Sequence, residues 1–383
     1  MLAFLVIALS LYGLINFYIG RRGAQALAAY PTARTVFLAF FIAMVLAYPL
    51  GRVLMGLAKG FPTAPLIKAG SFHMVVMLYG FLGVVLVDLA RLANAFFSFL
   101  PKSFTERPGA AGLVLFVVIA GSTAAAIIGG AINAARPRTV ELAWSIPKKA
   151  GPLDHVTVVL VSDLHLGSLV GRGRLEKTVA RINALEPDIV LMPGDIVDES
   201  VTEKIEAGFS EVMRRIRAPL GVFAVPGNHE FYSGLDRNLA CLRACGITVL
   251  EDQAVRVGAA FTLVGRKDRS SLKPGETRLA IPGILTAAGL DASLPIVVID
   301  HQPLHLEEAA AAGAALQLSG HTHDGQVFPF DVINGLIYEL NWGHLRKGGT
   351  HYYVTSGAGT WGPPIRVGSR AEVVRIRLSF SDN

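Results

Sequence analysis

The sequence predicts a two-part protein: an α-helical transmembrane bundle over residues 1–136, followed by an α/β domain over residues 137–383. Three observations lead to this fold class. The first third contains long stretches without a charged residue, the remainder contains short β-branched runs that alternate with helix-like segments, and polar residues gather directly after several of these runs. A chain of 383 residues is also long enough for two units.

Charge divides the chain in a similar way. Residues 1–150 contain 13 Lys or Arg and 3 Asp or Glu, whereas residues 151–383 contain 22 and 26. The net charge is therefore +10 in the first part and −4 in the second. Nucleic-acid binding needs clustered positive charge, so this distribution argues against a basic nucleic-acid face on the second part.

Four stretches of the first part carry no charge, and each can reach about 20 residues, the length of helix that crosses a bilayer. They are residues 1–20, 35–51, 69–87 and 108–135. We expect helices because the bilayer interior offers no hydrogen-bond partner to a free backbone amide. Residues 1–20 lack a basic start and a clear cleavage site, so we expect no removable signal peptide.

The predicted location is the cell membrane, with several spans. Four spans put both termini on one side, and that side collects seven basic residues: Arg52, Lys59, Lys68, Arg136, Arg138, Lys148 and Lys149. The other side collects six: Arg21, Arg22, Arg34, Arg91, Lys102 and Arg107. The margin of one charge favours a cytoplasmic C-terminal domain. The two cysteines, Cys241 and Cys245, are expected to be reduced, buried thiols, which agrees with a reducing compartment.

The second part opens with a strand-like alternation over residues 139–146. Short apolar runs then recur at residues 156–161, 189–192, 222–225, 261–264, 296–299, 316–318, 352–355 and 373–378. Helix-like segments, such as residues 175–185 and 203–216, separate several of them. This alternation predicts an α/β sheet domain.

Polar residues follow five of these runs directly. The sequences are "SDLHLG" with Asp163 and His165, "PGDIVD" with Asp195 and Asp198, "PGNHE" with Asn228 and His229, "DHQP" with His301, and "SGHTHDG" with His321 and His323. One such fragment alone is more often structural than functional. Five in the same strand-to-loop position predict one site, because ligands of open α/β sheets bind at the carboxyl ends of the strands.

The residue types indicate a metal site. Carboxylate, imidazole and amide oxygen together suit divalent Mn, Zn or Fe, and the absence of cysteine argues against a structural thiolate zinc site. Gly194, Gly227 and Gly320 stand where the chain must turn sharply or leave space beside an ion.

These five motifs, in this order, resemble the calcineurin-like metallophosphoesterase superfamily, and the apolar first third resembles its membrane-attached branch, the transmembrane proteins with a metallophosphoesterase domain. The resemblance covers about residues 137–380 and implies two packed β-sheets flanked by helices. It also implies two divalent ions. Asp163, His165 and His323 would hold one ion, Asn228, His301 and His321 the other, and Asp195 would bridge both.

The resemblance assigns three further residues. His229 would be the general acid, Asp198 would orient it, and Arg366, in the glycine-rich closing segment, would contact a substrate phosphate. Two departures stand out. Asp324 replaces a glycine usual in this branch, and "GDIVDES" lacks the arginine-glycine ending of protein Ser/Thr phosphatases.

The function implied is a membrane-anchored phosphoesterase. A hydroxide that bridges the two ions would attack the phosphorus of a phosphodiester or of a lipid-linked phosphate or diphosphate. The alternative is a non-catalytic membrane receptor or sensor that binds phosphate compounds through the metal site. A nuclease is disfavoured by the charge of −4 on the second part, which would repel a polyanion.

Overall fold

The computed structural model of the chain describes residues 2–57, 62–101, 108–148, 153–198, 203–258, 260–273 and 275–381. The chain divides into two compact units, Met1–Gly129 and Gly130–Asn383. The boundary lies inside a helix, ahead of the expected start of the second domain at residue 137, because the last turn of that helix packs with the second unit. The basic residues Lys59, Lys102, Arg107 and Lys149, used above for orientation, lie outside the described residues.

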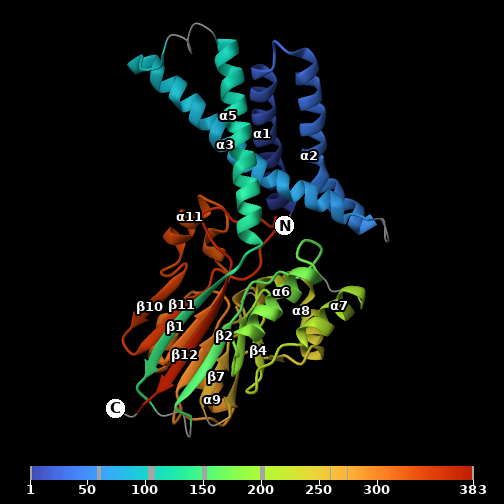
Figure 1. Ribbon diagram of the computed structural model, residues 1–383. Helices are drawn as coiled ribbons and strands as arrows, with labels where there is room; N and C mark the ends of the chain where they lie inside the picture. Colours follow the sequence, from blue (N-terminus) through green and yellow to red (C-terminus); the bar gives the residue numbers. More distant parts are fainter. Residues whose placement is uncertain are drawn as a thin grey trace. The chain divides into compact units, whose positions relative to one another are not determined.

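The first unit consists of long helices (Figure 1): α1 (Leu2–Ala26), α2 (Pro31–Leu57), α3 (Ala64–Phe97) and α5 (Pro108–Ala134). Among the described residues, three segments are long and apolar enough to cross a membrane: Pro31–Leu57, Ala64–Phe97 and Gly109–Ala134. Many of their large apolar side chains are exposed, among them Phe40, Leu86 and Val117. Three apolar helices therefore support membrane association. The first predicted span forms part of α1 and stays a prediction.

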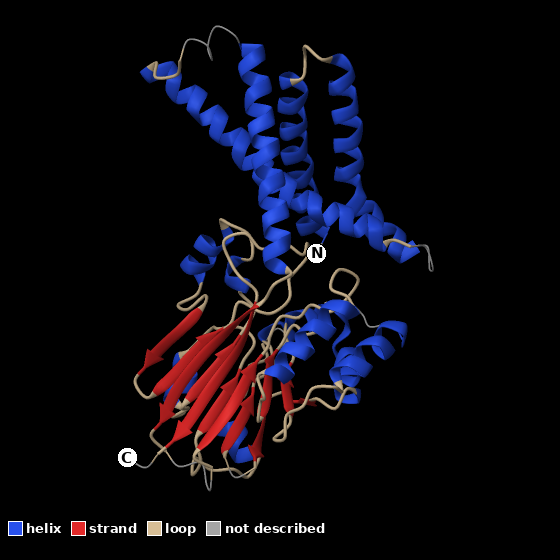
Figure 2. Cartoon of the chain, in the orientation of Figure 1, coloured by secondary structure: helices blue, strands red, loops and turns tan. Residues whose placement is uncertain are grey.

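The second unit contains two six-stranded mixed sheets (Figure 2). The first has the order β1 (Arg138–Ile146), β12 (Glu372–Phe380), β2 (His155–Leu160), β3 (Ile189–Pro193), β4 (Val222–Val225) and β5 (Thr248–Val249). The second has the order β10 (Gly343–Lys347), β11 (Thr350–Val354), β9 (Leu316–Ser319), β8 (Ile296–Ile299), β7 (Phe261–Gly265) and β6 (Gln253–Val257).

Three apolar cores create a four-layer arrangement. Neighbouring strand residues point to opposite faces of a sheet. In β2, Val159 accordingly joins the core shared with helices, whereas Leu160 joins the core shared with the second sheet. Helices α6 (Arg172–Ala184), α7 (Glu203–Met213) and α8 (Asn228–Ala244) cover the first sheet, and α9 (Ile281–Ala287) and α10 (Glu307–Ala311) cover the second. The predicted α/β class with two packed sheets is confirmed.

The strand directions determine where the polar loops meet. β2, β3 and β4 are parallel neighbours in the first sheet, and β7, β8 and β9 are parallel neighbours in the second. Parallel strands end at the same edge, so the loops after β2, β3, β4, β8 and β9 gather there. Cys241 and Cys245 are both buried against the first sheet, as expected.

Candidate metal centre

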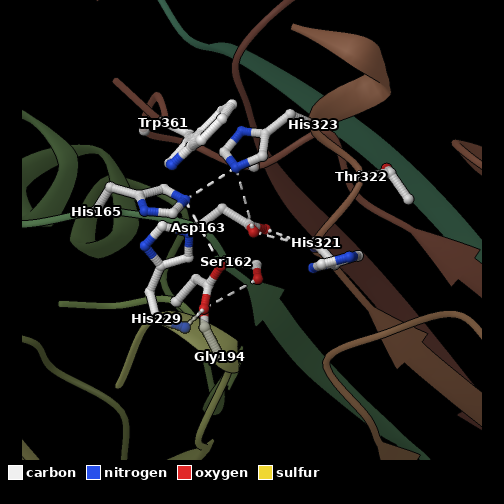
Figure 3. Close-up of polar contacts among 12 residues, drawn as sticks. Ser162, Asp163, His165, Gly194, His229, His321, Thr322, His323 and Trp361 are labelled. Carbon is white, nitrogen blue, oxygen red and sulfur yellow. Dashed lines mark hydrogen bonds and ion pairs between the residues drawn. The ribbon is translucent and has the colours of Figure 1, made fainter. Parts of the chain in front are cut away.

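Five loops bring the predicted residues into one site (Figure 3). The residues come from the ends of β2, β3, β8 and β9 and from the first turn of α8: Asp163, His165, Asp195, Asp198, Asn228, His229, His301, His321 and His323. Asp163, His165, Asp195 and His301 are almost completely buried. Residues separated by up to about 160 positions therefore share one pocket of side chains.

The first cluster consists of Asp163, His165 and His323, whose potential ligand atoms all lie within 4.8 Å of one another. Nε2 of His165 lies 2.9 Å from Nε2 of His323. Nε2 of His323 lies 3.6 Å from Oδ1 of Asp163. Two imidazole nitrogens that face each other share at most one proton, so both lone pairs are used only when a cation lies between them.

The second cluster consists of Asn228, His301 and His321. Oδ1 of Asn228 lies 3.0 Å from Nε2 of His301 and 3.0 Å from Nδ1 of His321. The two imidazole nitrogens are 3.2 Å apart. Ligand atoms with metal bonds of about 2.1 Å stand about 3 Å apart around the ion, so this triangle has the spacing of a coordination face.

Asp195 lies between the two clusters. Its Oδ2 is 3.2 Å from Nε2 of His301 and 3.8 Å from Nε2 of His165. Its other oxygen, Oδ1, accepts a hydrogen bond of 2.9 Å from the backbone N–H of His229. One oxygen is thus fixed by the backbone, and the other is directed at both sets of imidazoles.

The protonation of His321 and His323 agrees with a role as ligands, whereas His301 keeps a proton beside the Asp195 carboxylate. Burial lowers the pKa of His321 to about 4 and holds that of His323 well below its usual range, so both imidazoles are neutral near pH 7. Burial also opposes a charge on His301, but the Asp195 carboxylate outweighs it and raises the pKa of His301 well above the usual value. Neutral imidazoles and carboxylates are the donor set for borderline divalent ions.

The backbone of the site is strained at its ligands. Asp163, His165, Asp195, His321 and His323 have φ angles of 55°, 48°, 53°, 74° and 52°. Residues other than glycine uncommonly adopt this left-handed backbone conformation, and each instance costs on the order of 1–3 kcal/mol. Strain concentrated at five of the seven predicted ligands indicates that the loops are shaped for the site and not for stability alone.

Two glycines allow the carboxylates to approach. A Cβ at Gly227 would lie 2.1 Å from Oδ1 of Asp195, and a Cβ at Gly320 would lie 2.4 Å from Oδ2 of Asp163. Any larger residue would push the carboxylate out of place. The expectation that these glycines leave space at the site therefore has a direct geometric basis.

His229 lies at the edge of the site, beside Asp198. Nδ1 of His229 is 2.7 Å from Oδ1 of Asp198, and the His229 ring packs edge-on against His165 with a centroid distance of 4.7 Å. Burial opposes a charge on His229, but Asp198 and Asp195 outweigh it and raise its pKa. The exposed Trp361 lies 6.4 Å from His229 between ring centroids, so an aromatic ring lies beside this histidine.

Arg366 is buried, and backbone carbonyl oxygens surround its guanidinium. Its side chain is only 1% exposed. Nη2 donates to the carbonyl oxygens of Ser356 and Gly359 at 2.6 and 2.9 Å, and Nη1 donates to that of His323 at 3.1 Å. The guanidinium is thus occupied by backbone carbonyls and fixes the loop of a metal-ligand candidate, and the predicted phosphate contact stays a prediction.

Two further residues, to which the sequence analysis gave no role, hold the site together. Glu230 is fully buried, and its carboxylate accepts the backbone N–H groups of Asp195, Ile196, Val197 and Gly227 at 2.6–3.1 Å. Gln326 exchanges two hydrogen bonds with the backbone of Trp361, of 2.7 and 2.8 Å. The only sequence signal was their presence in the "PGNHE" and "GHTHDGQ" motifs.

Asp324, which stands where the resemblance implies a glycine, has a backbone conformation that suits glycine. Its φ of 50° and ψ of 43° lie in the left-handed region. Partial burial and the nearby Asp331 carboxylate raise the pKa of Asp324 to about 6. A titratable carboxyl group thus stands next to His323, where glycine would place none.

The chain is similar to known metallophosphoesterases. A family model described as calcineurin-like phosphoesterase matches residues 156–325. An uncharacterized metallophosphoesterase of Aquifex aeolicus is 31% identical over 230 residues, which cover 60% of this chain and 87% of that protein. The transmembrane protein with metallophosphoesterase domain of Danio rerio is 32% identical over 273 residues, 67% of this chain and 61% of the relative.

An uncharacterized metallophosphoesterase of Helicobacter pylori is 34% identical over 247 residues. That alignment spans 64% of each protein, so the chain matches less than two thirds of this relative and of the Danio relative. The matched part carries all five motifs, and the family uses a divalent metal centre to cleave phosphoesters. The chain belongs to the calcineurin-like metallophosphoesterase family, in its membrane-associated branch.

Proposed function

We propose that the protein is a membrane-anchored phosphoesterase that uses two divalent ions, Mn, Zn or Fe, to hydrolyse a phosphodiester or a lipid-linked phosphate or diphosphate. The observation that carries the proposal is the position of Asp195, whose Oδ2 lies between the two ligand clusters, 3.2 Å from His301 and 3.8 Å from His165. A single ion would not need donors on both sides of one carboxylate oxygen.

The seven ligands divide by cluster. Asp163, His165 and His323 would hold one ion, Asn228, His301 and His321 the other, and Asp195 would contact both. Two ions in this arrangement supply positive charge that neutralises the phosphoester and lowers the pKa of a water molecule. The carboxylates and neutral imidazoles provide the oxygen and nitrogen donors that such ions prefer.

His229 is the proposed general acid. Its Nδ1 lies 2.7 Å from Oδ1 of Asp198, which fixes the ring and leaves Nε2 to give its proton to the departing oxygen. The raised pKa of His229, produced by Asp198 and Asp195 against the effect of burial, keeps this proton available near neutral pH. Asp198 is the proposed orienting residue, as the resemblance implied.

The membrane unit is proposed to concentrate the substrate. A catalytic domain tethered to a bilayer meets lipid headgroups at high effective concentration. This supports a phospholipid, a nucleotide-linked lipid or an isoprenoid diphosphate as substrate. We propose a multi-pass protein whose catalytic domain faces the cytoplasm, on the basis of the distribution of basic residues and the two buried cysteines.

The central experiment separates metal binding from acid catalysis. Full-length protein and two variants, Asp195→Asn and His229→Ala, are loaded with Mn, Zn or Fe and examined by elemental analysis. Each is then assayed on an aryl phosphodiester and on a phosphodiester with an alkyl leaving group. We expect Asp195→Asn to lose metal and activity together. His229→Ala should keep the metal and lose on the order of 10²- to 10⁴-fold in rate on the alkyl substrate.

The leaving group provides an internal control. An aryloxide leaving group needs little protonation, so His229→Ala should lose much less rate on the aryl substrate. Full turnover of His229→Ala on the alkyl phosphodiester would refute the acid role. A wild-type protein that binds metal but hydrolyses no member of a panel of phosphomonoesters, phosphodiesters and lipid diphosphates would refute the enzymatic function.

A further inference from the structure

Helix α11 (Phe330–Ile337) presents its apolar side chains to the outside. Val332, Ile333, Leu336 and Ile337 are 54%, 44%, 84% and 62% exposed. These positions recur at i, i+1, i+4 and i+5, so they form one face of the helix. No residue of α11 is buried, although the helix is strongly amphipathic in sequence.

The polar side of α11 faces the protein instead. Nδ2 of Asn334 donates to the carbonyl oxygen of Thr322 at 2.8 Å. The backbone of Asp331 is so close to Gly325 that a Cβ at Gly325 would lie 2.0 Å from its nitrogen. A helix of a water-soluble domain normally buries its apolar face, so this inverted arrangement requires an apolar partner outside the fold.

The helix contacts the loop that carries His321 and His323. Thr322 and Gly325 contact its polar side. Thr322 directly precedes the ligand candidate His323, and Gly325 follows it by two residues. The ring of Tyr338, which follows the helix, lies 6.0 Å from that of His321. Whatever covers the apolar face of α11 is therefore brought next to both metal clusters.

A series of backbone contacts within the second unit links this region to the end of a membrane-length helix. The N–H of Phe328 donates to the carbonyl oxygen of Val367 at 2.8 Å. The neighbouring Arg366 donates its backbone N–H to the carbonyl of Gly130 at 3.0 Å, and Nδ2 of Asn133 donates to the carbonyls of Arg366 and Ser369. Gly130 and Asn133 belong to the last turn of α5, whose segment Gly109–Ala134 is long and apolar enough to cross a membrane.

The aromatic residues of the same region have the character of a membrane interface. Phe328 and Phe330 are 49% and 46% exposed, and Trp361 is 58% exposed. The backbone of Trp361 forms two hydrogen bonds with the side chain of Gln326, two residues before Phe328. Exposed tryptophan beside an apolar helix is typical of the boundary between water and lipid.

From these contacts we infer that the apolar face of α11 docks on the lipid bilayer and holds the edge of the domain that carries the metal centre in the headgroup layer. The catalytic role of that edge rests on the proposed function, whereas the docking itself rests on the contacts of α11. Such a helix buries its apolar side chains about 5–10 Å into the boundary of the headgroups and acyl chains. A phosphoester at the same depth would reach the site without leaving the membrane, which narrows the substrate class to phospholipid-like molecules.

The test places a fluorescent label on the apolar face. Leu336→Cys and Val332→Cys variants of the full-length protein, labelled with an environment-sensitive fluorophore, are reconstituted in phosphatidylcholine liposomes with ordinary or brominated acyl chains. Ser379→Cys is the matched control, since Ser379 is exposed near the end of β12 that lies away from the site. The native cysteines are buried, and unsubstituted protein gives the labelling background.

We expect brominated lipids to reduce the fluorescence at both α11 positions by at least about twofold and to leave the Ser379→Cys signal unchanged. Equal fluorescence in both lipids at Leu336→Cys and Val332→Cys would overturn the inference. This holds both for a label exposed to water and for a label covered by protein. Hydrolysis of an aryl phosphodiester is measured on the same samples. Active protein without quenching overturns the docking alone, and quenched protein that hydrolyses neither the aryl phosphodiester nor any member of the panel above overturns the proposed function alone.

Discussion

Asp198 places one carboxylate oxygen, Oδ1, 2.7 Å from Nδ1 of His229. The same oxygen lies 3.1 Å from Nδ1 of His165. Asp198 therefore orients both the proposed acid and a ligand candidate, because the bond to Nδ1 fixes which imidazole nitrogen faces the site. Burial opposes its charge, but the two histidines outweigh this and hold the pKa of Asp198 well below the usual range.

This double contact predicts that Asp198→Asn weakens both metal affinity and turnover. Loss of an orienting carboxylate typically costs 10- to 100-fold in metal affinity or activity, so we expect about that loss in each. Metal titration by calorimetry and steady-state kinetics of the loaded protein measure the two effects. Asp154→Asn, the same change at an exposed position, is the control. Asp198→Asn with unchanged metal affinity would show that His165 is oriented without this contact.

Arg366 yields a prediction opposite to the one made from sequence. Its guanidinium lies among the carbonyl oxygens of Ser356, Gly359 and His323, so Arg366→Ala leaves several buried acceptors without a donor. We expect a loss of at least about 3 kcal/mol in the free energy of unfolding, together with weaker metal binding. Arg366→Lys should restore little, because an ammonium group cannot span these acceptors as the planar guanidinium does.

Thermal unfolding of the metal-free and metal-loaded full-length protein tests this assignment. Arg370→Ala, an arginine removed from an exposed position of the same segment, is the control and should leave the midpoint unchanged. A normal unfolding midpoint for Arg366→Ala, combined with a raised KM and unchanged metal affinity, would instead support the phosphate contact that the sequence first indicated.

The nature of each residue's environment determines what could be predicted from the sequence. The polar motifs were recognisable because they follow buried strands such as β2 and β3, whose residues are apolar on both faces. β6 and β10 were not predicted, since both are edge strands that carry charged residues and are half exposed. The hydrogen bonds of Arg366 were not predicted, because its burial depends on loops that are distant in sequence from one another.

Backbone geometry also lay beyond sequence patterns. The left-handed conformations of Asp195 and His323 occur at residue types that adopt them more often than other non-glycine residues do, but still in a small minority of cases, so the sequence alone does not indicate them. The four N–H groups that converge on Glu230 are equally invisible in sequence, because they come from the loop after β3 and from the turn before α8. The residue types predicted a metal site, whereas the hydrogen bonds that hold its loops in place could be identified only from the folded structure.

Glu230 provides the next prediction. Its two oxygens receive four backbone N–H groups of the loops that carry Asp195 and Asn228, so Glu230→Gln turns one acceptor into an NH₂ group that faces other donors. We expect a loss of about 2–3 kcal/mol in stability and at least about 10-fold weaker metal binding. Calorimetric metal titration and thermal unfolding measure both quantities, with the exposed Glu141→Gln as control. Metal affinity equal to that of the wild type would show that the two loops hold their shape without this carboxylate.

A stacked group away from the metal centre predicts how stability depends on pH. Trp144 stacks on His344 and His351 at centroid distances of 5.0 and 5.2 Å, and the two imidazoles share a contact of 3.0 Å between ring nitrogens. Burial lowers the pKa of both histidines, and Arg346 lowers them further. The unfolded chain then binds more protons than the folded one, so this stabilisation is complete above the unfolded histidine pKa of about 6.5 and is lost as the pH falls below it.

We expect the unfolding midpoint of the wild type to fall by at least about 2 °C more than that of the His344→Gln, His351→Gln double variant between about pH 7.5 and pH 5.5. His305→Gln, at an exposed position, should retain the wild-type slope. Identical slopes for the double variant and the wild type would mean that these two imidazoles accept protons as readily in the folded protein as in the unfolded chain.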